Sequence, residues 1–266
     1  MLFDHIMKKI LTLTIGCLLA VSAYAQTDTI RLQDKRLNTS VLKPALNQYL
    51  VYFQNPKKGR TLGFSFWMRD IRLTERNGEK VFAITQHWYG TDSASYRSVY
   101  SINKAADFAP LYHAETIGVK TRAYNWGQDK ITGADTVAQN LNKNFKLDFK
   151  APNFNWNLDI ETFEMLPLAA GKSFVINFYD AGLSPPEWVT YKVIGSEVIT
   201  TFNSQKVDCW KLFTEGDYKG NHYSETYWIS KKDREFLKEE DSFNGGFRYK
   251  IKMPGASPDL LTRFDK

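Results

Sequence analysis

Cysteine is scarce in this sequence: its 266 residues include two, Cys17 and Cys209. We expect Cys17 to be removed with an N-terminal signal segment, so the mature chain would form no internal disulfide and its core alone would stabilise it. Cys209 lies between Asp208 and Trp210 on a predicted strand, with no neighbouring base to activate a thiol nucleophile. We therefore expect Cys209 to be a buried structural thiol.

Long blocks of one charge are also missing. Lys and Arg number 35 against 29 Asp and Glu, which gives a net charge of +6, and the basic residues are scattered among acidic ones. Such a mild, dispersed charge argues against a nucleic-acid partner.

Motifs for metal binding or nucleophilic catalysis are absent as well. His87, His113 and His222 are not spaced as metal ligands are, and one cysteine does not complete a ligand set. The sequence contains no Gly-x-Ser-x-Gly serine motif and no glycine-rich phosphate loop. It therefore predicts no metal site and no cofactor.

Long apolar runs are missing except near the N-terminus. Lys8 and Lys9 precede an apolar run over residues 10–21, and Ala23-Tyr24-Ala25 has the small-x-small pattern that signal peptidase cleaves. The run is shorter than the ~20 residues that a membrane span needs. The pattern therefore predicts an exported protein.

We expect residues 1–25 to be a cleaved signal peptide and Gln26 to be the mature N-terminus. The alternative is lipid attachment at Cys17, which follows a glycine as a lipoprotein cysteine does. The mature chain is predicted to have no transmembrane span and to reside in the periplasm or at the periphery of the outer membrane.

Aromatic residues, by contrast, make up 15 % of the chain, which suits the faces of β-sheets. Short runs rich in β-branched and aromatic residues recur between Pro, Gly, Asn and Asp clusters, as strands between turns do. Beyond a hairpin over residues 61–88, the predicted strands are 47–53, 95–102, 111–117, 120–126, 130–137, 145–149, 173–179, 187–194, 197–202, 206–214, 222–230, 235–243 and 246–253.

Asn77-Gly78 is the strongest turn signal, because this dipeptide favours the two-residue loop of a β-hairpin. With this loop, Trp67 lies opposite Trp88, Arg69 opposite Gln86, and Ile71 opposite Ile84, all on one largely apolar face. Gly195-Ser196 predicts a second tight hairpin, between residues 187–194 and 197–202.

One segment follows a helical rather than a strand pattern. Trp156, Ile160, Phe163 and Leu166 recur at helical spacing, and a proline follows. We expect a short helix near residues 158–165, capped by Asn157.

Together these elements predict a mainly β protein. Its antiparallel strands would form a curved open barrel or a sandwich, with one short helix. We expect a flexible leader over residues 26–40 and a single β-rich domain over 41–266, with a division into two halves near residue 166 as the alternative.

Arg69 is the most informative candidate residue, because it is a cation predicted at the centre of an apolar sheet face. A buried guanidinium is costly unless it is paired, so a buried carboxylate is the favoured partner. The alternatives are that this face lines a wet or ligand-holding cavity, or that Arg69 stacks between two tryptophans. The candidate ligand-binding residues are Trp67, Arg69, Gln86, Trp88, Trp156 and Phe163.

Two groups of carboxylates could have either a structural or a functional role. Asp159, Glu161 and Glu164 in the predicted helix could act as acid and base, but a solvated helix face is the favoured interpretation. Glu239 and Asp241 share one face of a predicted strand, which we interpret as a charged sheet edge that discourages aggregation.

Four strings carry a family resemblance: Ala109–His113, Met165–Leu168, Tyr191–Gly195 and Trp228–Lys232. In this order they resemble exported bacterial proteins with a domain of unknown function, which is distantly similar in architecture to the lipoprotein-sorting (Lol) carriers. The resemblance implies an incomplete, curved β-barrel with a helix against its concave side. It supplies no catalytic residues, and this chain lacks the several plugging helices of the carriers.

The leading functional hypothesis is a non-catalytic envelope module that binds an apolar or amphipathic, lipid-like ligand. One alternative is an envelope hydrolase that uses Asp159, Glu161 or Glu164. The other is a structural module or an interaction module for another envelope protein.

Overall fold

The computed structural model describes residues 27–55, 62–90, 92–183 and 185–254. The predicted signal peptide, its cleavage site and the acylation site at Cys17 lie outside these residues. The strands are β1 (Thr27–Ile30), β2 (Ala45–Gln54), β3 (Leu62–Arg76), β4 (Glu79–Tyr89), β5 (Arg97–Lys104), β6 (Pro110–Ile117), β7 (Lys120–Trp126), β8 (Lys130–Gly133), β9 (Lys146–Asp148), β10 (Phe154–Asn155), β11 (Ser173–Tyr179), β12 (Glu187–Thr200), β13 (Lys206–Tyr218), β14 (Asn221–Ser230), β15 (Phe236–Phe243) and β16 (Gly246–Lys252).

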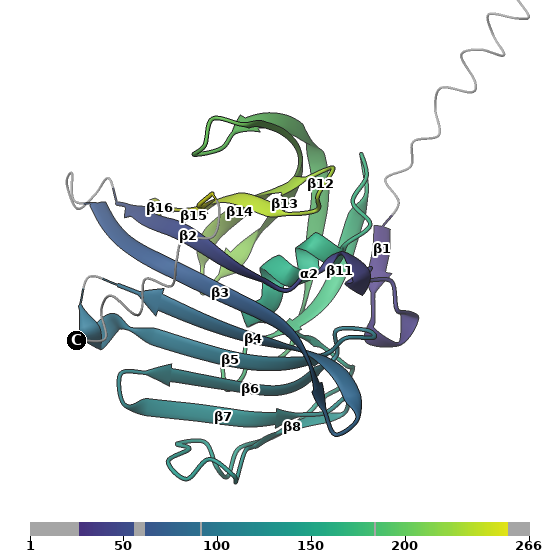
Figure 1. The fold of residues 1–266 in the computed structure, drawn as a ribbon, viewed down its shortest axis with the longest axis vertical. Coiled ribbons are helices and arrows are strands. Elements are labelled where there is room, and N and C mark those ends of the chain that lie inside the picture. The colour runs from purple at the N-terminus through teal and green to yellow at the C-terminus, as the bar shows by residue number, and fades with distance from the viewer. Residues whose placement is uncertain (1–26, 56–61, 91, 184, 255–266) are drawn as a thin grey trace, which may run out of the picture.

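These strands form one sheet built from two antiparallel meanders, β2 to β9 and β11 to β16. The pairing of β16 with β2 joins the meanders, while β1 and β10 both run parallel to β11. The sheet curls so that its two arms face each other (Figure 1). The predicted fold class, a mainly β protein whose antiparallel strands form a curved open barrel or sandwich with one short helix, is confirmed.

The helix α2 (Asp159–Met165) lies on the concave side, between the arms of the sheet (Figure 1). A 3-10 helix, η5 (Trp156–Leu158), leads into it. Phe163 is fully buried, with its ring centroid 4.7 Å from those of both Tyr191 and Tyr227 on the sheet. Burial of such aromatic side chains is the main force that holds the helix inside.

Asn157 is not the helix cap that we expected. The capping contact is made by Asn155, whose side chain accepts a hydrogen bond from the Asn157 backbone N–H. The chain enters the helix through a 3-10 turn, so the capping position lies two residues earlier than the simple pattern predicts. The Asn157 side chain is thereby free to bind Arg97 and Asp180.

The hairpin between β3 and β4 has the predicted register. Trp67 pairs with Trp88, Arg69 with Gln86, and Ile71 with Ile84. Asn77 and Gly78 have φ values of 53° and 78°, as the two loop residues of a type I′ turn require.

Replacing Gly78 with Val is expected to lower the free energy of unfolding by ~1–2 kcal/mol, because a side chain is strained at this positive φ. Replacing it with Asn should cost less, since Asn tolerates the left-handed region. Denaturant unfolding of both variants measures the difference. Equal stability of the two variants would contradict the turn assignment.

The second predicted hairpin is wrong. Gly195 and Ser196 lie inside the continuous strand β12, where the pairing register with β13 shifts between Val193 and Gly195. Gly195 has a φ of 146°, so the glycine accommodates a bulge rather than a turn. The chain reverses later, between Thr200 and Lys206.

The predicted leader is also structured over its described part. Residues 27–30 form β1, and 3-10 helices follow at η1 (Leu32–Asp34) and η2 (Thr39–Val41). Ile30, Leu32 and Leu37 are buried against the core of the sheet. Because these apolar residues are isolated among polar ones, the segment lacks the periodicity that marks an element in the sequence.

Candidate functional site

The site begins on the inner face of the β3–β4 hairpin. The rings of Trp67 and Trp88 stack face to face, with centroids 4.0 Å apart and planes 4° from parallel. At this distance no room remains for the Arg69 side chain between the two rings, so the alternative in which Arg69 stacks between the tryptophans is wrong. The cation that lies on Trp88 is instead Arg97, 4.0 Å from the ring centroid.

Arg69 forms the buried ion pair that its position on an apolar face predicts. Its Nη1 donates to Glu161 Oε2 at 2.6 Å, and its Nη2 lies 3.5 Å from Asp159 Oδ1. Arg69 and Glu161 are 2 % and 1 % exposed. The charge on β3 is therefore neutralised by α2, which ties the helix to the sheet.

Gln86 completes the polar contacts of this face. Its Nε2 donates to the Asn157 backbone carbonyl at 2.8 Å, and its Oε1 accepts from Trp88 Nε1 at 3.2 Å. The hairpin thus holds η5 as well as α2.

The sequence predicted a solvated helix face for Asp159, Glu161 and Glu164, but two of these carboxylates are buried. Glu161 and Glu164 are 1 % and 7 % exposed, because α2 lies inside the curled sheet. Glu164 Oε1 accepts a hydrogen bond from the Phe236 backbone N–H at 2.8 Å. Burial nevertheless raises the pKa of Glu164 to about 8.

Glu239 and Asp241 do not form a charged edge either. Their strand, β15, lies between β14 and β16, and both side chains point into the concavity, 0 % and 9 % exposed. Arg248 binds both carboxylates, and Lys250 binds Glu239. Burial and the neighbouring Glu239 raise the pKa of Asp241, whereas Lys250 and Arg248 overcome the effect of burial and lower the pKa of Glu239.

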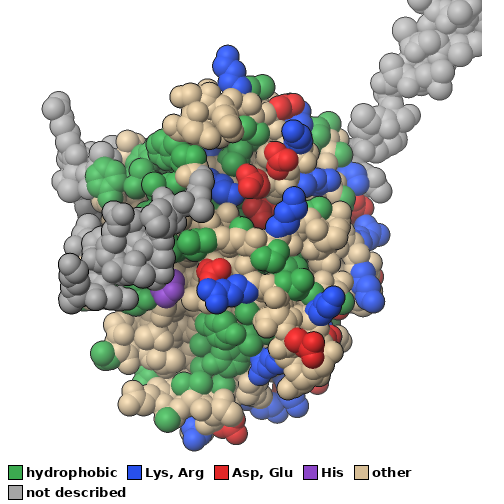
Figure 2. Space-filling model, viewed as in Figure 1, with side chains coloured by type: hydrophobic (Ala, Val, Ile, Leu, Met, Phe, Trp, Pro, Cys, Tyr) green, Lys and Arg blue, Asp and Glu red, His purple; other side chains and the backbone are tan. Residues whose placement is uncertain are grey.

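A cavity of about 890 Å³ opens at one end of the curled sheet. It is bordered by the β11–β12 connection, the β13–β14 and β15–β16 turns and the end of β2. Its apolar wall is formed by Phe53, Phe178, Leu183, Tyr218, Phe243 and Phe247. Apolar side chains gather in patches on the visible face of the molecule, including one over the β14–β16 region (Figure 2).

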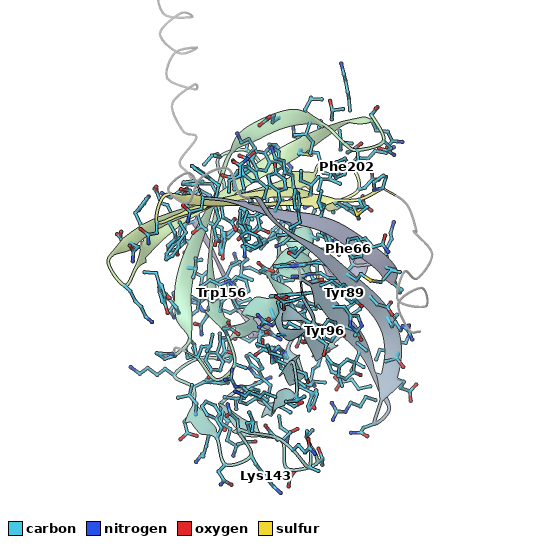
Figure 3. All side chains as sticks on the ribbon, turned by 90° about the vertical axis from the view of Figure 1, so that its left-hand side faces the viewer. Phe66, Tyr89, Tyr96, Lys143, Trp156 and Phe202 are labelled. Atoms are coloured by element: carbon cyan, nitrogen blue, oxygen red, sulfur yellow. The ribbon has the colours of Figure 1, made fainter. Side chains whose placement is uncertain are left out.

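A smaller, polar cavity of about 310 Å³ adjoins it. Trp156, Asp180, Glu225 and Arg248 line both cavities, so the two share a wall or a passage. Figure 3 shows Trp156 in the space between the arms of the sheet. The site is therefore a cavity with an apolar wall that adjoins a smaller, charged cavity.

The six predicted site residues divide into two groups. Trp67, Arg69, Trp88 and Trp156 line the smaller cavity, and Trp156 also lines the larger one. Gln86 and Phe163 are fully buried and line neither. Of the three helix carboxylates, Asp159 lines the smaller cavity, whereas Glu161 and Glu164 line neither.

Sequence reasoning missed five charged residues of the smaller cavity, two of which carry a recognisable spacing signal. On β16, Arg248 and Lys250 lie two residues apart, as do Glu239 and Asp241 on the paired strand. An acid faces a base at both paired positions, Glu239 with Lys250 and Asp241 with Arg248. This pattern indicates a buried ion-pair network as readily as a solvated sheet edge. The others are Arg97, Asp180 and Glu225.

The remaining candidates lie away from both cavities. His113 is buried beside Ser101 and Asn155, and burial lowers its pKa to about 3, so it stays neutral. Burial raises the pKa of the Cys209 thiol to about 12, which fits the expected structural role. Across the described ranges, no cluster of His, Cys, Asp and Glu is arranged to hold a metal ion.

Within the described part of the chain, no helix is long and apolar enough to cross a membrane. Comparison with solved structures finds a similar fold in a beta-barrel-like protein of the domain of unknown function DUF1849 from Brucella abortus. The TM-score is 0.54 at 11 % identity, and the match covers 80 % of this chain and 96 % of that chain. At this identity the likeness shows the fold alone.

No curated protein matches the sequence. A family described as "Protein of unknown function (DUF3108)" matches residues 48–252, from β2 to the end of β16. This range includes the helix and almost every strand of the curled sheet. The expected resemblance to an unknown-function domain of barrel-like architecture is confirmed, and the chain belongs to the DUF3108 family.

Proposed function

We propose that this chain is a non-catalytic binding module of the bacterial cell envelope, which holds an amphipathic, lipid-like ligand in its curled sheet. The observation that carries the proposal is the cavity of about 890 Å³ with an apolar wall, which adjoins a smaller cavity lined by charged side chains. Binding cavities for small molecules typically measure ~300–1,000 Å³ and combine apolar walls with a few polar groups.

The rim of the larger cavity is unusually apolar for a surface. Phe53, Leu183, Phe243 and Phe247 are 42 %, 64 %, 46 % and 39 % exposed. Single exposed apolar side chains are ordinary, but four at the mouth of one cavity favour a surface that contacts an apolar partner. A ligand chain that lay across them would bury this area.

The envelope location rests on the N-terminal sequence. Lys8 and Lys9, the apolar run and Ala23-Tyr24-Ala25 have the pattern of a secretory signal, so the mature module would meet lipids or other envelope proteins. One cysteine is expected to remain after cleavage. It cannot form an internal disulfide, so the fold does not depend on disulfide formation in the oxidising envelope.

Native mass spectrometry of the protein purified from envelopes tests both parts. The expected result is a chain that begins at Gln26 and carries a noncovalent, lipid-like mass that organic solvent releases. Leu183→Asp should reduce affinity for the ligand by about ten-fold, because it removes apolar contact at the mouth.

Val198→Asp is the matched control. Val198 is 60 % exposed, close to the 64 % of Leu183, but it lies on β12 away from both cavities. A chain that carries no bound mass would contradict the binding proposal. A chain that begins at acylated Cys17 would show a lipid-anchored rather than a soluble module.

A further inference from the structure

The larger cavity is rich in carboxyl groups. Two cations, Lys219 and Arg248, line it. Five acidic side chains face them there: Asp180, Glu187, Asp217, Glu225 and Asp241. A concave wall of one dominant sign attracts ligands of the opposite charge and repels those of the same charge.

The cations of the smaller cavity are already neutralised by protein carboxylates. Arg69 is paired with Glu161 and Asp159, and Arg97 with Glu115. Arg248 and Lys250 are paired with Glu239, and Arg248 also with Asp241. An anionic ligand would have to displace these contacts.

Asp180 and Glu225, by contrast, form no ion pair within 4.0 Å among the described residues, although both line both cavities. Asp180 Oδ1 accepts from Asn157 Nδ2 at 2.9 Å, and Glu225 Oε2 accepts from the Tyr227 hydroxyl at 2.6 Å. Burial raises the pKa of both carboxyls. Each would gain a stabilising partner from a cation that entered the site.

Asp241, which also lines the larger cavity, is by contrast already engaged inside the protein. It is paired with Arg248, and burial together with the neighbouring Glu239 raises its pKa. Among the described residues, the carboxyls that line both cavities and remain without a cation partner are therefore Asp180 and Glu225.

Trp156 lies at the junction of the two cavities, with its ring centroid 5.7 Å from that of Phe178. The faces of indole rings attract ammonium groups, particularly when water is excluded. Carboxylates and an aromatic ring at one junction are the combination that binds organic cations.

We propose that the ligand carries a cationic ammonium group on an apolar body, and that this group lies between Asp180 and Glu225 beside Trp156. The inference rests on the proposed function, since the apolar body occupies the larger cavity. It excludes ligands whose only charge is an anionic phosphate, sulfate or carboxylate.

Calorimetric titration with three probes of one chain length tests the inference: decyltrimethylammonium, decyl maltoside and decyl sulfate, each below its micellar concentration. The fixed charge of the first probe does not titrate. We expect it to bind at least about ten-fold more tightly than the neutral probe, as one partly buried charge pair allows, and the sulfate to bind weakest.

Asp180→Asn and Glu225→Gln should each weaken binding of the cationic probe by about ten-fold more than they weaken binding of decyl maltoside. Asp70→Asn is the control, because Asp70 is paired with Arg72 and lines neither cavity. Thermal melts verify that the variants are folded. If one variant fails to fold, the order of the three probes on the unaltered protein and the other variant decide the result.

The outcomes separate the two proposals. Equal or tighter binding of decyl maltoside would overturn the ammonium inference and leave the binding module intact, as would preference for decyl sulfate. Failure of all three probes to bind would overturn the proposed function itself.

Discussion

Replacing Arg69 with Met is expected to lower the free energy of unfolding by ~3–5 kcal/mol, the usual cost of breaking a buried ion pair. The substitution leaves Glu161 at 1 % exposure without its cation. Met retains most of the arginine stem's packing, so lost apolar contact explains little of the effect. Denaturant unfolding with an unchanged slope measures it.

A double substitution separates the stranded charge from other causes. Arg69→Met combined with Glu161→Leu should recover most of the lost stability, because a buried pair replaced by apolar residues is often close to neutral. Asp159 is the second partner of Arg69, but its side chain is 15 % exposed at the smaller cavity and can be hydrated. If the double variant is as unstable as Arg69→Met, the ion pair is not the origin of the loss.

The β3–β4 hairpin was predictable because its signals are local. Asn77-Gly78 fixes the loop, and the loop fixes the register of every pair as far as Trp67 and Trp88. The need of Arg69 for a buried carboxylate also followed from its position on the apolar face. Which carboxylate it meets did not, since Glu161 lies 92 residues away in sequence.

Gly195 shows why a similar signal failed on β12. A glycine with a positive φ can form a turn or absorb an extra residue in a strand, and the short pattern around it fits both. The choice is made by β13, which pairs with β12 on both sides of Gly195. That long-range pairing leaves no trace in the local sequence.

The charged interior was the largest gap in the sequence-based picture. An alternating strand with acids on one face is usually solvated, so Glu239 and Asp241 fitted an exposed edge. The curl of the sheet turns that face inward, where Arg248 and Lys250 meet it. Curvature arises from the whole sheet, and a single strand does not encode it.

Replacing Glu164 with Gln is expected to stabilise the protein at high pH and to change little at low pH. Burial raises the pKa of Glu164 to about 8, from 4.5 as its ordinary value. Between pH 4.5 and about pH 8, the folded chain therefore keeps a proton that the unfolded chain has released. The stability contributed by the neutral carboxyl is complete below pH 4.5 and is lost as pH rises through 8.

The expected gain in the free energy of unfolding follows from the difference between the two pKa values, at about 1.4 kcal/mol for each pH unit. Gln keeps the acceptor for the Phe236 backbone N–H but never ionises. The variant should match the natural protein at pH 4.5 and exceed its free energy of unfolding by ~5 kcal/mol at pH 9.

Glu235→Gln is the control for the loss of one negative charge near the same backbone. Glu235 is half-exposed and pairs with Lys252, so its removal should produce no comparable gain at pH 9. The measurement is denaturant unfolding of the natural protein and both variants across this pH range. A Glu164→Gln curve that runs parallel to that of the natural protein would show that Glu164 is ionised in the folded state, and that α2 holds a buried charge rather than a neutral acid.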